Sequence, residues 1–465
     1  MTRAWMAALA CAAIAIAVLA VRPVRTPGPL ARDFEAYWAA GSTWTAHADP
    51  YGRAIWNAER TIPGVDARHD ELLPFIGPPA TLLAWSIAVR LPYENATRAW
   101  WAILAVGVLA LAAAVICGSG MPITGFSVFA ALVLAIAFAP ISSDLALGQL
   151  ALPAFVGAAL VVILAERWLI AATLAACLAF TQPNAAIGLI SQLGRNRATI
   201  AVAAGALLAY AVGAIAAGWM WPFAYLHVLA AHGAAERFIA IQFSPAAIAY
   251  GLGAPPFAAG AIGIALAASA IGAAIAIGHR VRERFARFCA FAALSPFVAG
   301  FFHEHDLVVA YAAAVWCALR TTATTRTIAL AGTLLAGVDW LGFAQRPTGI
   351  VQSGLLAIAA FAAFVALSKD VKPREIGPVA IAVAVIFTGA AVLATHHPAP
   401  VWPTTLAAYH APANAGAAEV WLAEQRASGL LAVVPAWALL RSLSLLGCAL
   451  LAYAIYRHSA YCRTA

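Results

Sequence analysis

The sequence predicts an all-α protein that crosses a membrane as a polytopic helical bundle of about 12–14 spans. Of its 465 residues, 64% are hydrophobic and only 10% are charged, whereas soluble domains lie nearer one half and one quarter. Apolar runs long enough for a helical span, about 20 residues, recur along the chain almost without pause. Helices are expected because lipid offers backbone groups no hydrogen-bond partner outside their own helix.

The first expected span is the apolar run at residues 4–21. Such a run can also be a cleaved signal peptide, but Arg22, Pro23 and Arg25 follow it without a small-residue cleavage site, so we expect a retained span. The other expected spans are 74–91, 99–117, 121–140, 147–165, 168–191, 198–218, 255–278, 286–302, 306–320, 327–343, 350–367, 376–395 and 430–456.

The net charge of +8 is interpreted as membrane topology, and no nucleic-acid partner is expected. With the N-terminus inside, most basic residues of the connections fall on the cytoplasmic side. These are Arg90, Arg98, Arg195, Arg197, Arg280, Arg282, Arg284, Arg287, Arg320, Arg326, Lys369, Lys372, Arg374, Arg457 and Arg463. The shorter outer connections hold only Arg167, Arg237, Arg346 and Arg426. We therefore expect a multi-pass protein of the plasma (inner) membrane, surrounded by membrane lipids.

No internal repeat or soluble domain is evident, so residues 1–465 are expected to form a single membrane domain. Its outer face carries four segments, 22–73, 219–240, 301–306 and 396–429, which hold most of the histidines. The seven Cys residues form no CxxC pair and no metal-ligand spacing, so they are expected to be buried small hydrophobic side chains.

The first outer loop, residues 22–73, is unusually acidic. It holds seven of the nineteen acidic residues, namely Asp33, Glu35, Asp49, Glu59, Asp66, Asp70 and Glu71. The spacing of Asp33, Tyr37 and Ala40 puts them on one side of a short interfacial helix, which would direct the Asp33 carboxylate toward the bundle. Asp33 could cap that helix or act as a catalytic base, and spacing alone favours neither role.

The start of this loop carries a recognisable pattern: Asp-Phe, then Tyr-Trp-x-Ala-Gly, then Pro-Tyr. The residues are Asp33, Phe34, Tyr37, Trp38, Ala40, Gly41, Pro50 and Tyr51. They resemble the opening signature of glycosyltransferase family 87, the polyprenyl-phosphate-mannose-dependent α-mannosyltransferases of the C superfamily. The resemblance implies a glycosyltransferase C-like fold with a large outer first loop, 22–73, that carries the catalytic residue, and with the loop 396–429 near the site.

Weaker matches to this family continue along the chain. The entry to the next span keeps Phe75, Pro78 and Pro79 but has Gly77 where the family has Tyr. A Gly-Gln pair that opens a later span in the family appears as Gly148-Gln149.

The Lys-Pro pair of the family is replaced by Gln182-Pro183, followed by Asn184, so an ionic role at that point is in doubt. A Ser-Pro and a His-Asp-Leu opening are matched by Ser295-Pro296 and His305-Asp306-Leu307. Order and rough spacing agree over about the first 310 residues, and the remainder matches only in being apolar.

The resemblance implies an inverting transfer of a hexose, with mannose indicated, from a polyprenyl-phosphate donor to a glycolipid or glycan acceptor of the cell envelope at the outer face. Asp33 is the expected general base, with Glu35 in reserve, and the rings of Tyr37 and Trp38 are expected to bind sugar faces. Donor or acceptor binding is expected of Glu35, Tyr37, Trp38, Phe75, Pro78, Pro79, Gln149, Gln182, Asn184, His303, His305, Asp306 and Arg441.

A cation is expected near the outer headgroups, because it would stabilise the negative charge that develops on the leaving lipid phosphate. Arg441 is the only basic residue well inside an apolar run, and it falls near the outer end if the last span starts near 438. Arg441 could instead snorkel to the interface without a ligand. His303 and His305 are alternative partners for phosphate or hydroxyl, with Glu304 and Asp306 holding their tautomers.

A metal at the His-Glu-His-Asp run 303–306 is the alternative to these roles. Alternate residues do not share a helix face, and the run lacks the i, i+4 histidine pair of zinc helices. We therefore expect no divalent metal and no cofactor besides the donor substrate.

Two questions stay open at this point. The span count puts Gly148-Gln149 on the cytoplasmic side, away from Asp33, so either 99–140 does not make two full crossings or Gln149 packs between helices. A transporter or flippase of lipid-linked sugars is the rival function, and it would show mid-span charges and broken helices in matching halves. A non-catalytic scaffold of an envelope complex would not need Asp33.

Overall fold

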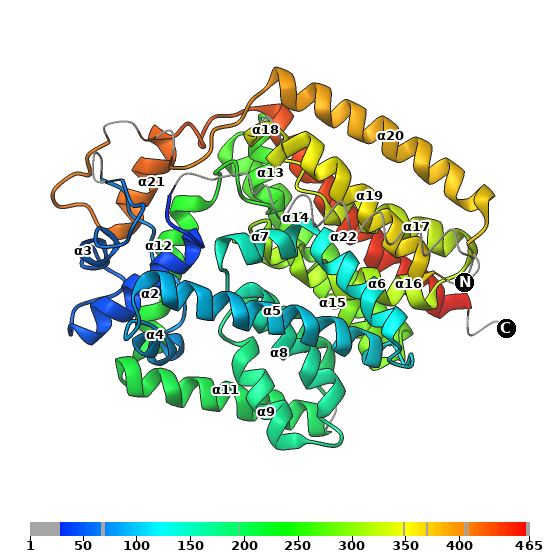
Figure 1. Ribbon diagram of the computed structural model, residues 1–465, viewed down its shortest axis with the longest axis horizontal. Helices are drawn as coiled ribbons and strands as arrows, with labels where there is room; N and C mark the ends of the chain where they lie inside the picture. The colour runs from blue at the N-terminus through cyan, green and yellow to red at the C-terminus, as the bar shows by residue number, and fades with distance from the viewer. Residues whose placement is uncertain are drawn as a thin grey trace.

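The computed structural model of the chain describes residues 28–461, except 67–69, 195, 347–348, 369–370, 404–405 and 407–408. The expected first span at 4–21 lies outside these described residues. Within the described part, every regular element is a helix, as the sequence predicted (Figure 1).

Over the described residues, six helices are long and apolar enough to cross a membrane. They are α5 (Tyr93–Gly118), α11 (Asn196–Ala217), α14 (Pro256–Arg280), α17 (Ala323–Gly337) continued by α18 (Gly342–Gln345), α20 (Pro373–His396) and α22 (Pro435–Tyr461). The count rises to seven if α6 (Gly125–Ala137) and α7 (Ala139–Leu147), which meet at a bend of 69°, form one broken span. These are the helices of a multi-pass membrane protein.

The described chain has fewer long spans than the roughly 12–14 expected, because several apolar runs are short or broken. The run 168–191 is divided into α9 (Leu169–Ala179), α10 (Pro183–Ala186) and the 3-10 helix η2 (Ile187–Gln192). The run 147–165 forms α8 (Ala151–Leu164), whose 14 residues reach about 21 Å, short of the roughly 30 Å hydrocarbon core. Hydropathy counts apolar residues, but it does not locate breaks such as the one before Pro183.

Shorter helices fill the interior and the connections. They are η1 (Pro79–Thr81), α4 (Leu82–Ala88), α12 (Trp221–Glu236), α13 (Pro245–Gly251), α15 (Arg284–Val298), η3 (His305–Val308), α16 (Val309–Arg320) and α19 (Gly349–Leu367). Helix α16 is enclosed, since no residue from Val309 to Ala318 is more than 1% exposed. Helices α17 and α22 pack closely because Gly332 has no side chain at their contact. A Cβ there would lie 3.0 Å from the Gly447 carbonyl oxygen.

One end of the molecule is formed by the described residues of 28–73 and 396–429, here called the cap (Figure 1). The first of these segments carries α2 (Arg32–Thr45) and α3 (Ile55–Glu59), so the loop does contain short helices; the second carries α21 (Ala417–Ala427). Backbone and side chain join the two: the Leu72 amide donates to Glu424 Oε1 at 2.8 Å, and Arg32 Nη1 donates to the Trp402 carbonyl at 2.7 Å.

The cap meets the bundle where α7 ends against the start of α2. Gly148 ends α7 with φ +75°, and a Cβ there would lie 2.8 Å from Ala31 Cβ and 3.0 Å from Phe34 Cβ. The Gly148 carbonyl also accepts a hydrogen bond from Trp100 Nε1 at 2.7 Å. Only glycine adopts this backbone readily and leaves the space that α2 occupies.

Replacing Gly148 with Ala is therefore expected to destabilise the protein. The left-handed backbone costs about 1–2 kcal/mol for a residue with a Cβ, and overpacking against α2 adds to that cost. Thermal unfolding in detergent measures the effect. Gly272→Ala in α14 is the matched control, because a Cβ there meets nothing within 4 Å. Equal unfolding midpoints for the two variants would contradict the packing described for Gly148.

Candidate active site

The site begins with Asp33, in the first turn of α2, and Gln149, directly after α7. Gln149 Nε2 donates to Asp33 Oδ2, and the Tyr37 hydroxyl donates to Gln149 Oε1 at 2.6 Å. Asp33 and Tyr37 thus share one side of α2, as their spacing predicted. The alternative that Asp33 caps the helix is wrong, since α2 has no side-chain cap and the bonded oxygen faces Gln149.

The hydrogen bond between Gln149 and Asp33 also corrects the expected topology. Both residues must lie on the same side of the membrane, whereas the span count had separated them. The cause lies in the expected span 74–91, which forms only η1 and α4 and does not lead away from α2. Trp38 Nε1 donates to the Leu91 carbonyl, and the Tyr93 hydroxyl donates to the Leu30 carbonyl at 2.6 Å, so α5 starts beside α2. The chain returns to this end through α6 and α7, where Trp100 donates to the Gly148 carbonyl. The explanation that 99–140 does not make two full crossings is therefore not what places Gln149 beside Asp33.

Asp306, in η3, is the centre of a second group. Its Oδ1 accepts from Gln182 Nε2 at 3.0 Å, and its Oδ2 accepts from Asn184 Nδ2 at 3.1 Å and from the His303 amide at 3.0 Å. The break between α9 and α10 brings Gln182 and Asn184 within hydrogen-bond distance of the Asp306 carboxylate. Three of the expected residues are therefore together, held by neutral donors where the family has a lysine.

His303 pairs with a carboxylate that the sequence analysis did not single out. Its Nε2 lies 3.1 Å from Glu236 Oε2, which also accepts from Gln242 Nε2 at 2.8 Å. Trp421 Nε1, from the cap, donates to the other oxygen of Glu236. Glu304 and Asp306 were expected to orient the histidine rings, but for His303 this is wrong, because Asp306 binds its backbone amide and not its ring.

A sequence signal for Glu236 did exist: it is the only acidic residue between Glu166 and Glu283. A lone carboxylate in a long apolar stretch is a functional candidate in a membrane protein. Its partner could not be read from the sequence, because His303 lies far along the chain.

The two histidines differ in electrostatics. Burial lowers the pKa of His303, but the charges of Glu236, Asp306 and Asp33 raise it, and the net shift is upward. For His305, burial is the largest cause and the net shift of the pKa is downward, which favours the neutral imidazole. Asp33 contributes to both shifts, so its carboxylate lies in the same electrostatic environment as the two rings.

Arg441 lies inside α22 and is 2% exposed. Its Nη1 donates to the Gln242 carbonyl and, at 3.4 Å, to the Ile239 carbonyl, while its Nε donates to the Trp437 carbonyl at 3.2 Å. The snorkelling alternative is wrong, because the guanidinium is turned inward. No carboxylate of the described chain forms an ion pair with Arg441, so it is a buried cation held only by carbonyl dipoles.

Gln242 connects Arg441 to the histidine group. Its carbonyl binds Arg441, its side-chain oxygen accepts from the Phe302 amide at 2.8 Å, and its side-chain nitrogen donates to Glu236. A continuous path of hydrogen bonds therefore runs from Arg441 through Gln242 and Glu236 to His303, and on to Asp306. Gln242 was not among the predicted residues, and nothing in its local sequence marks it.

Glu35 lies in a different environment, inside the cap. It is buried, and burial first, followed by Glu71 and Asp33, raises its pKa to about 8 against the opposing charge of Arg32. No hydrogen bond joins it to the Asp33 or Asp306 groups within the described chain. Glu35 is therefore part of the interior of the cap and not of the hydrogen-bonded groups around Asp33 and Asp306.

The remaining predicted residues make packing contacts on or near α2. Trp38, within α2, donates from Nε1 to the Leu91 carbonyl at 3.3 Å. Phe75 is buried between Tyr37 and Tyr51, at ring-centroid distances of 6.4 and 5.3 Å. Pro78 and Pro79 begin η1, where the Pro78 carbonyl accepts from the Thr81 hydroxyl at 2.8 Å. These contacts are structural.

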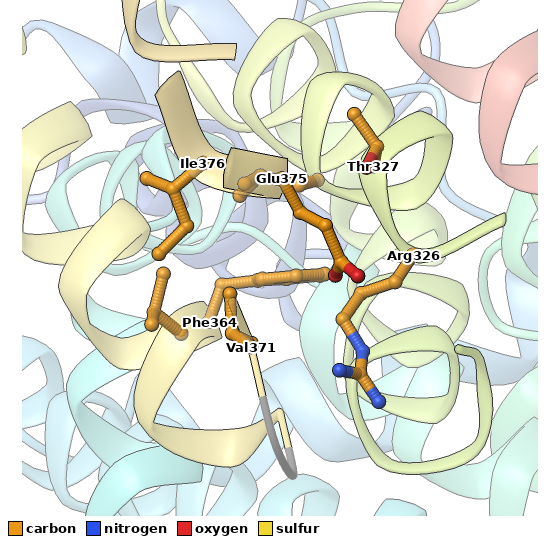
Figure 2. A pocket seen from close by; sticks show the side chains of 8 residues that line it. Arg326, Thr327, Phe364, Val371, Glu375 and Ile376 are labelled. Atoms are coloured by element: carbon orange, nitrogen blue, oxygen red, sulfur yellow. The ribbon is translucent and has the colours of Figure 1, made fainter. Parts of the chain in front are cut away.

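Two hollows elsewhere do not compete with this site. The one in Figure 2, lined by Arg326, Phe364 and Glu375 among others, offers about 10 Å³, roughly the space of one water molecule. A wider, open hollow of about 310 Å³ lies over α3. Its arginines are already engaged, Arg60 with Asp70 and Arg53 with the Pro412 and Ala413 carbonyls.

The site thus combines a partly exposed carboxylate, a buried cation and two imidazoles in a molecule built mainly of apolar helices. Such a combination can remove a proton, stabilise an anion and hold polar ligand groups. Comparisons of the chain with protein-family models, with curated proteins and with solved structures found no match.

Proposed function

We propose that the protein is a membrane glycosyltransferase, and that it moves a hexose, mannose in the first instance, from a polyprenyl-phosphate donor to a glycolipid or glycan acceptor. The transfer would take place at the outer face of the plasma membrane. The observation that carries the proposal is Asp33: one oxygen is fixed by Gln149, and Oδ1 accepts no hydrogen bond from any described residue. A carboxylate held in this way is suited to accept a proton from a substrate hydroxyl.

The proposed reaction is a single displacement. The acceptor hydroxyl oxygen bonds to the anomeric carbon as its proton passes to Asp33 Oδ1. The bond from that carbon to the phosphate oxygen breaks, and its electron pair leaves with the polyprenyl phosphate. Attack from the face opposite the leaving group inverts the anomeric configuration.

Arg441 is the proposed partner of the leaving phosphate. A buried guanidinium without a carboxylate partner in the described chain attracts an anion, and the low dielectric around α22 strengthens that attraction. The path through Gln242 and Glu236 to His303 would fix the cation relative to the histidine group. Tyr37 stacks on Trp85 at 4.9 Å, so in this proposal it orients Gln149 and does not bind a sugar face.

Gln149 acts in this scheme as a positioning residue for Asp33. Replacing Gln149 with Leu is expected to lower kcat by about 10–100-fold, because a slightly misplaced base loses its geometry with the acceptor. KM should change little. Combining Gln149→Leu with Tyr37→Phe should cost less than the sum of the two single effects, since both residues act through one hydrogen-bonded pair. Fully additive effects in this double-mutant cycle would contradict the positioning role.

Donor choice tests the proposal as a whole. The purified chain in lipid vesicles is supplied with polyprenyl-phosphate mannose or polyprenyl-phosphate glucose, radiolabelled in the sugar, together with a membrane lipid extract. We expect label from the mannose donor to appear in a new glycolipid or glycan. Absence of incorporation from either donor would count against glycosyl transfer.

A transporter or flippase of lipid-linked sugars is the second candidate. Two features favour it: the break between α6 and α7, and the buried Arg441 inside a membrane helix. In the same vesicles, a flippase would move the labelled donor across the membrane with its sugar–phosphate bond intact. Scoring intact donor on each leaflet therefore separates the two functions.

A further inference from the structure

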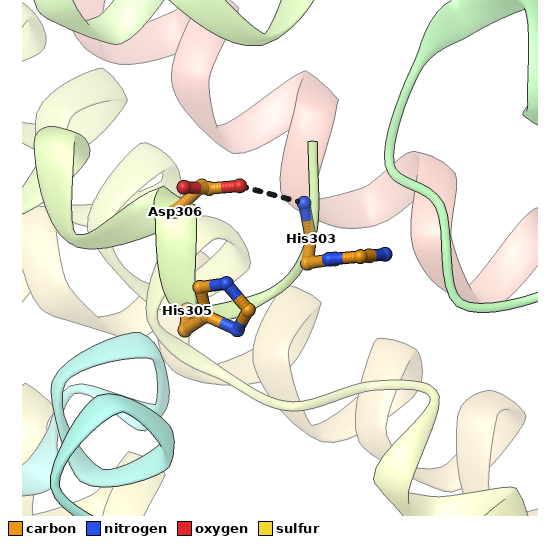
Figure 3. Close-up of side chains that lie close together, drawn as sticks. All are labelled: His303, His305 and Asp306. Carbon is orange, nitrogen blue, oxygen red and sulfur yellow. Dashed lines mark hydrogen bonds between the residues drawn. The ribbon is translucent and has the colours of Figure 1, made fainter. Parts of the chain in front are cut away.

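Three side chains with metal-binding atoms converge at the turn before α16. His303, His305 and Asp306 each offer one ligand atom, and these atoms all lie within 4.8 Å of one another (Figure 3). A metal was not expected here because alternate residues do not share the face of an α-helix. That argument does not apply, because His303 precedes the helix and η3 is a short 3-10 helix.

The partners of His303 match those of a metal-bound histidine. A ligating imidazole usually donates its second ring N–H to a carboxylate, which fixes the tautomer and the ring orientation. His303 Nε2 lies 3.1 Å from Glu236 Oε2, and Glu236 is itself fixed by Gln242 and by Trp421. With the ring proton on Nε2, which faces Glu236, the Nδ1 lone pair of His303 is free for a ligand.

His305 supplies the second imidazole. It is 6% exposed, and its ring has no hydrogen-bond partner within the described part of the chain. Both of its ring nitrogens are therefore open to a ligand, apart from the one that carries the proton of the neutral ring. Its centroid lies 5.5 Å from that of His303, and Figure 3 shows the ring beside the Asp306 carboxylate. A ligand bound between the two rings would be within reach of His305.

Asp306 retains capacity for one more bond. Each carboxylate oxygen offers two lone pairs. Oδ2 accepts from Asn184 and from the His303 amide, and Oδ1 accepts only from Gln182. One lone pair of Oδ1 therefore remains, on a carboxylate whose orientation is already fixed by three donors.

We propose that His303, His305 and Asp306 bind a divalent transition-metal ion, and that the ion is zinc. Two imidazoles and one carboxylate, with a fourth position open, form a donor set typical of zinc, whereas calcium and magnesium prefer oxygen ligands throughout. Tetrahedral zinc places its ligand atoms about 3.3 Å apart, so the three side chains would close by about 1.5 Å or less. The site goes beyond the proposed transfer and does not depend on it.

Zinc binding to the full chain tests this site directly. The protein is purified in detergent without a histidine tag, treated with a chelator, and titrated with zinc alone. We expect about one tightly bound zinc per chain by elemental analysis, and a cobalt form with the visible absorption of tetrahedral coordination. His305→Ala should abolish both signals without unfolding the chain, because His305 holds no other residue by a hydrogen bond.

Two further variants sharpen the test. Glu236→Gln should weaken zinc binding by about 10–100-fold, as loss of a carboxylate behind a ligating histidine does. The exposed pair His396 and His397, replaced together by Ala, is the matched control and should leave binding unchanged. Absence of bound zinc in the native chain, or unchanged binding in His305→Ala, overturns the site. Because zinc is counted without substrate, a negative result leaves the proposed transfer to its own assay.

Discussion

Replacing Asp33 with Asn is expected to lower sugar transfer by about 10²–10⁴-fold, the range that a general base contributes. The amide keeps the size of the side chain and a carbonyl oxygen for Gln149, so the hydrogen bond to Gln149 Nε2 can persist. What is lost is the basic Oδ1 that would take the acceptor proton. Initial rates with radiolabelled donor measure the effect, and the thermal unfolding midpoint should stay close to that of the native protein.

The control for this variant comes from the same loop. Asp49 is exposed, and it accepts a hydrogen bond from the Tyr51 amide at 3.0 Å. Asp49→Asn makes the same chemical change in the cap away from the site, and it should transfer at the native rate. Native transfer by Asp33→Asn would remove the central role given to Asp33.

Replacing Arg441 with Met is expected to lower transfer by about 10²–10³-fold, comparable to the loss of a group that stabilises developing negative charge. Methionine fills much of the same space inside α22 but carries no charge. Polyprenyl phosphate should also inhibit this variant more weakly than the native protein, because the charge that attracts the leaving phosphate is gone. Initial rates and product inhibition measure the two effects.

Two comparisons make the Arg441 result specific. Arg441→Lys keeps a charge but loses the planar fork that reaches both the Trp437 and Gln242 carbonyls, so we expect only partial activity. Arg426→Met removes an exposed cation from α21 and should have no effect. Native product inhibition in Arg441→Met would show that the phosphate binds elsewhere.

Local spacing predicted part of this arrangement well. Asp33 and Tyr37 share a side of α2 because helical periodicity alone puts them there. The abundance of apolar helices followed from composition, since only helices satisfy their backbone in lipid without partners. The resemblance also named Gln149, Gln182, Asn184 and Asp306, residues that the fold brings into two hydrogen-bonded groups.

Other features depended on contacts that no local pattern encodes. Glu236 and His303 meet only because α12 and the turn before α16 approach one another in the folded chain. The short helical segment 79–88, which stays beside α2 and does not cross, reversed the side expected for Gln149, and a count of apolar runs has no means of detecting it. Phe75, Pro78 and Pro79 matched the family pattern, yet packing around α2 and η1 explains each of them.

The fate of a doubly labelled donor tests the proposed function most directly. The donor carries radiolabel in both the sugar and the polyprenyl phosphate, and the purified chain is given the donor and acceptor lipids in vesicles. We predict equal amounts of sugar-labelled product and free polyprenyl phosphate, with the product linkage of inverted anomeric configuration. If both labels instead stay together and change leaflet, the protein is a transporter, and the catalytic role of Asp33 is contradicted.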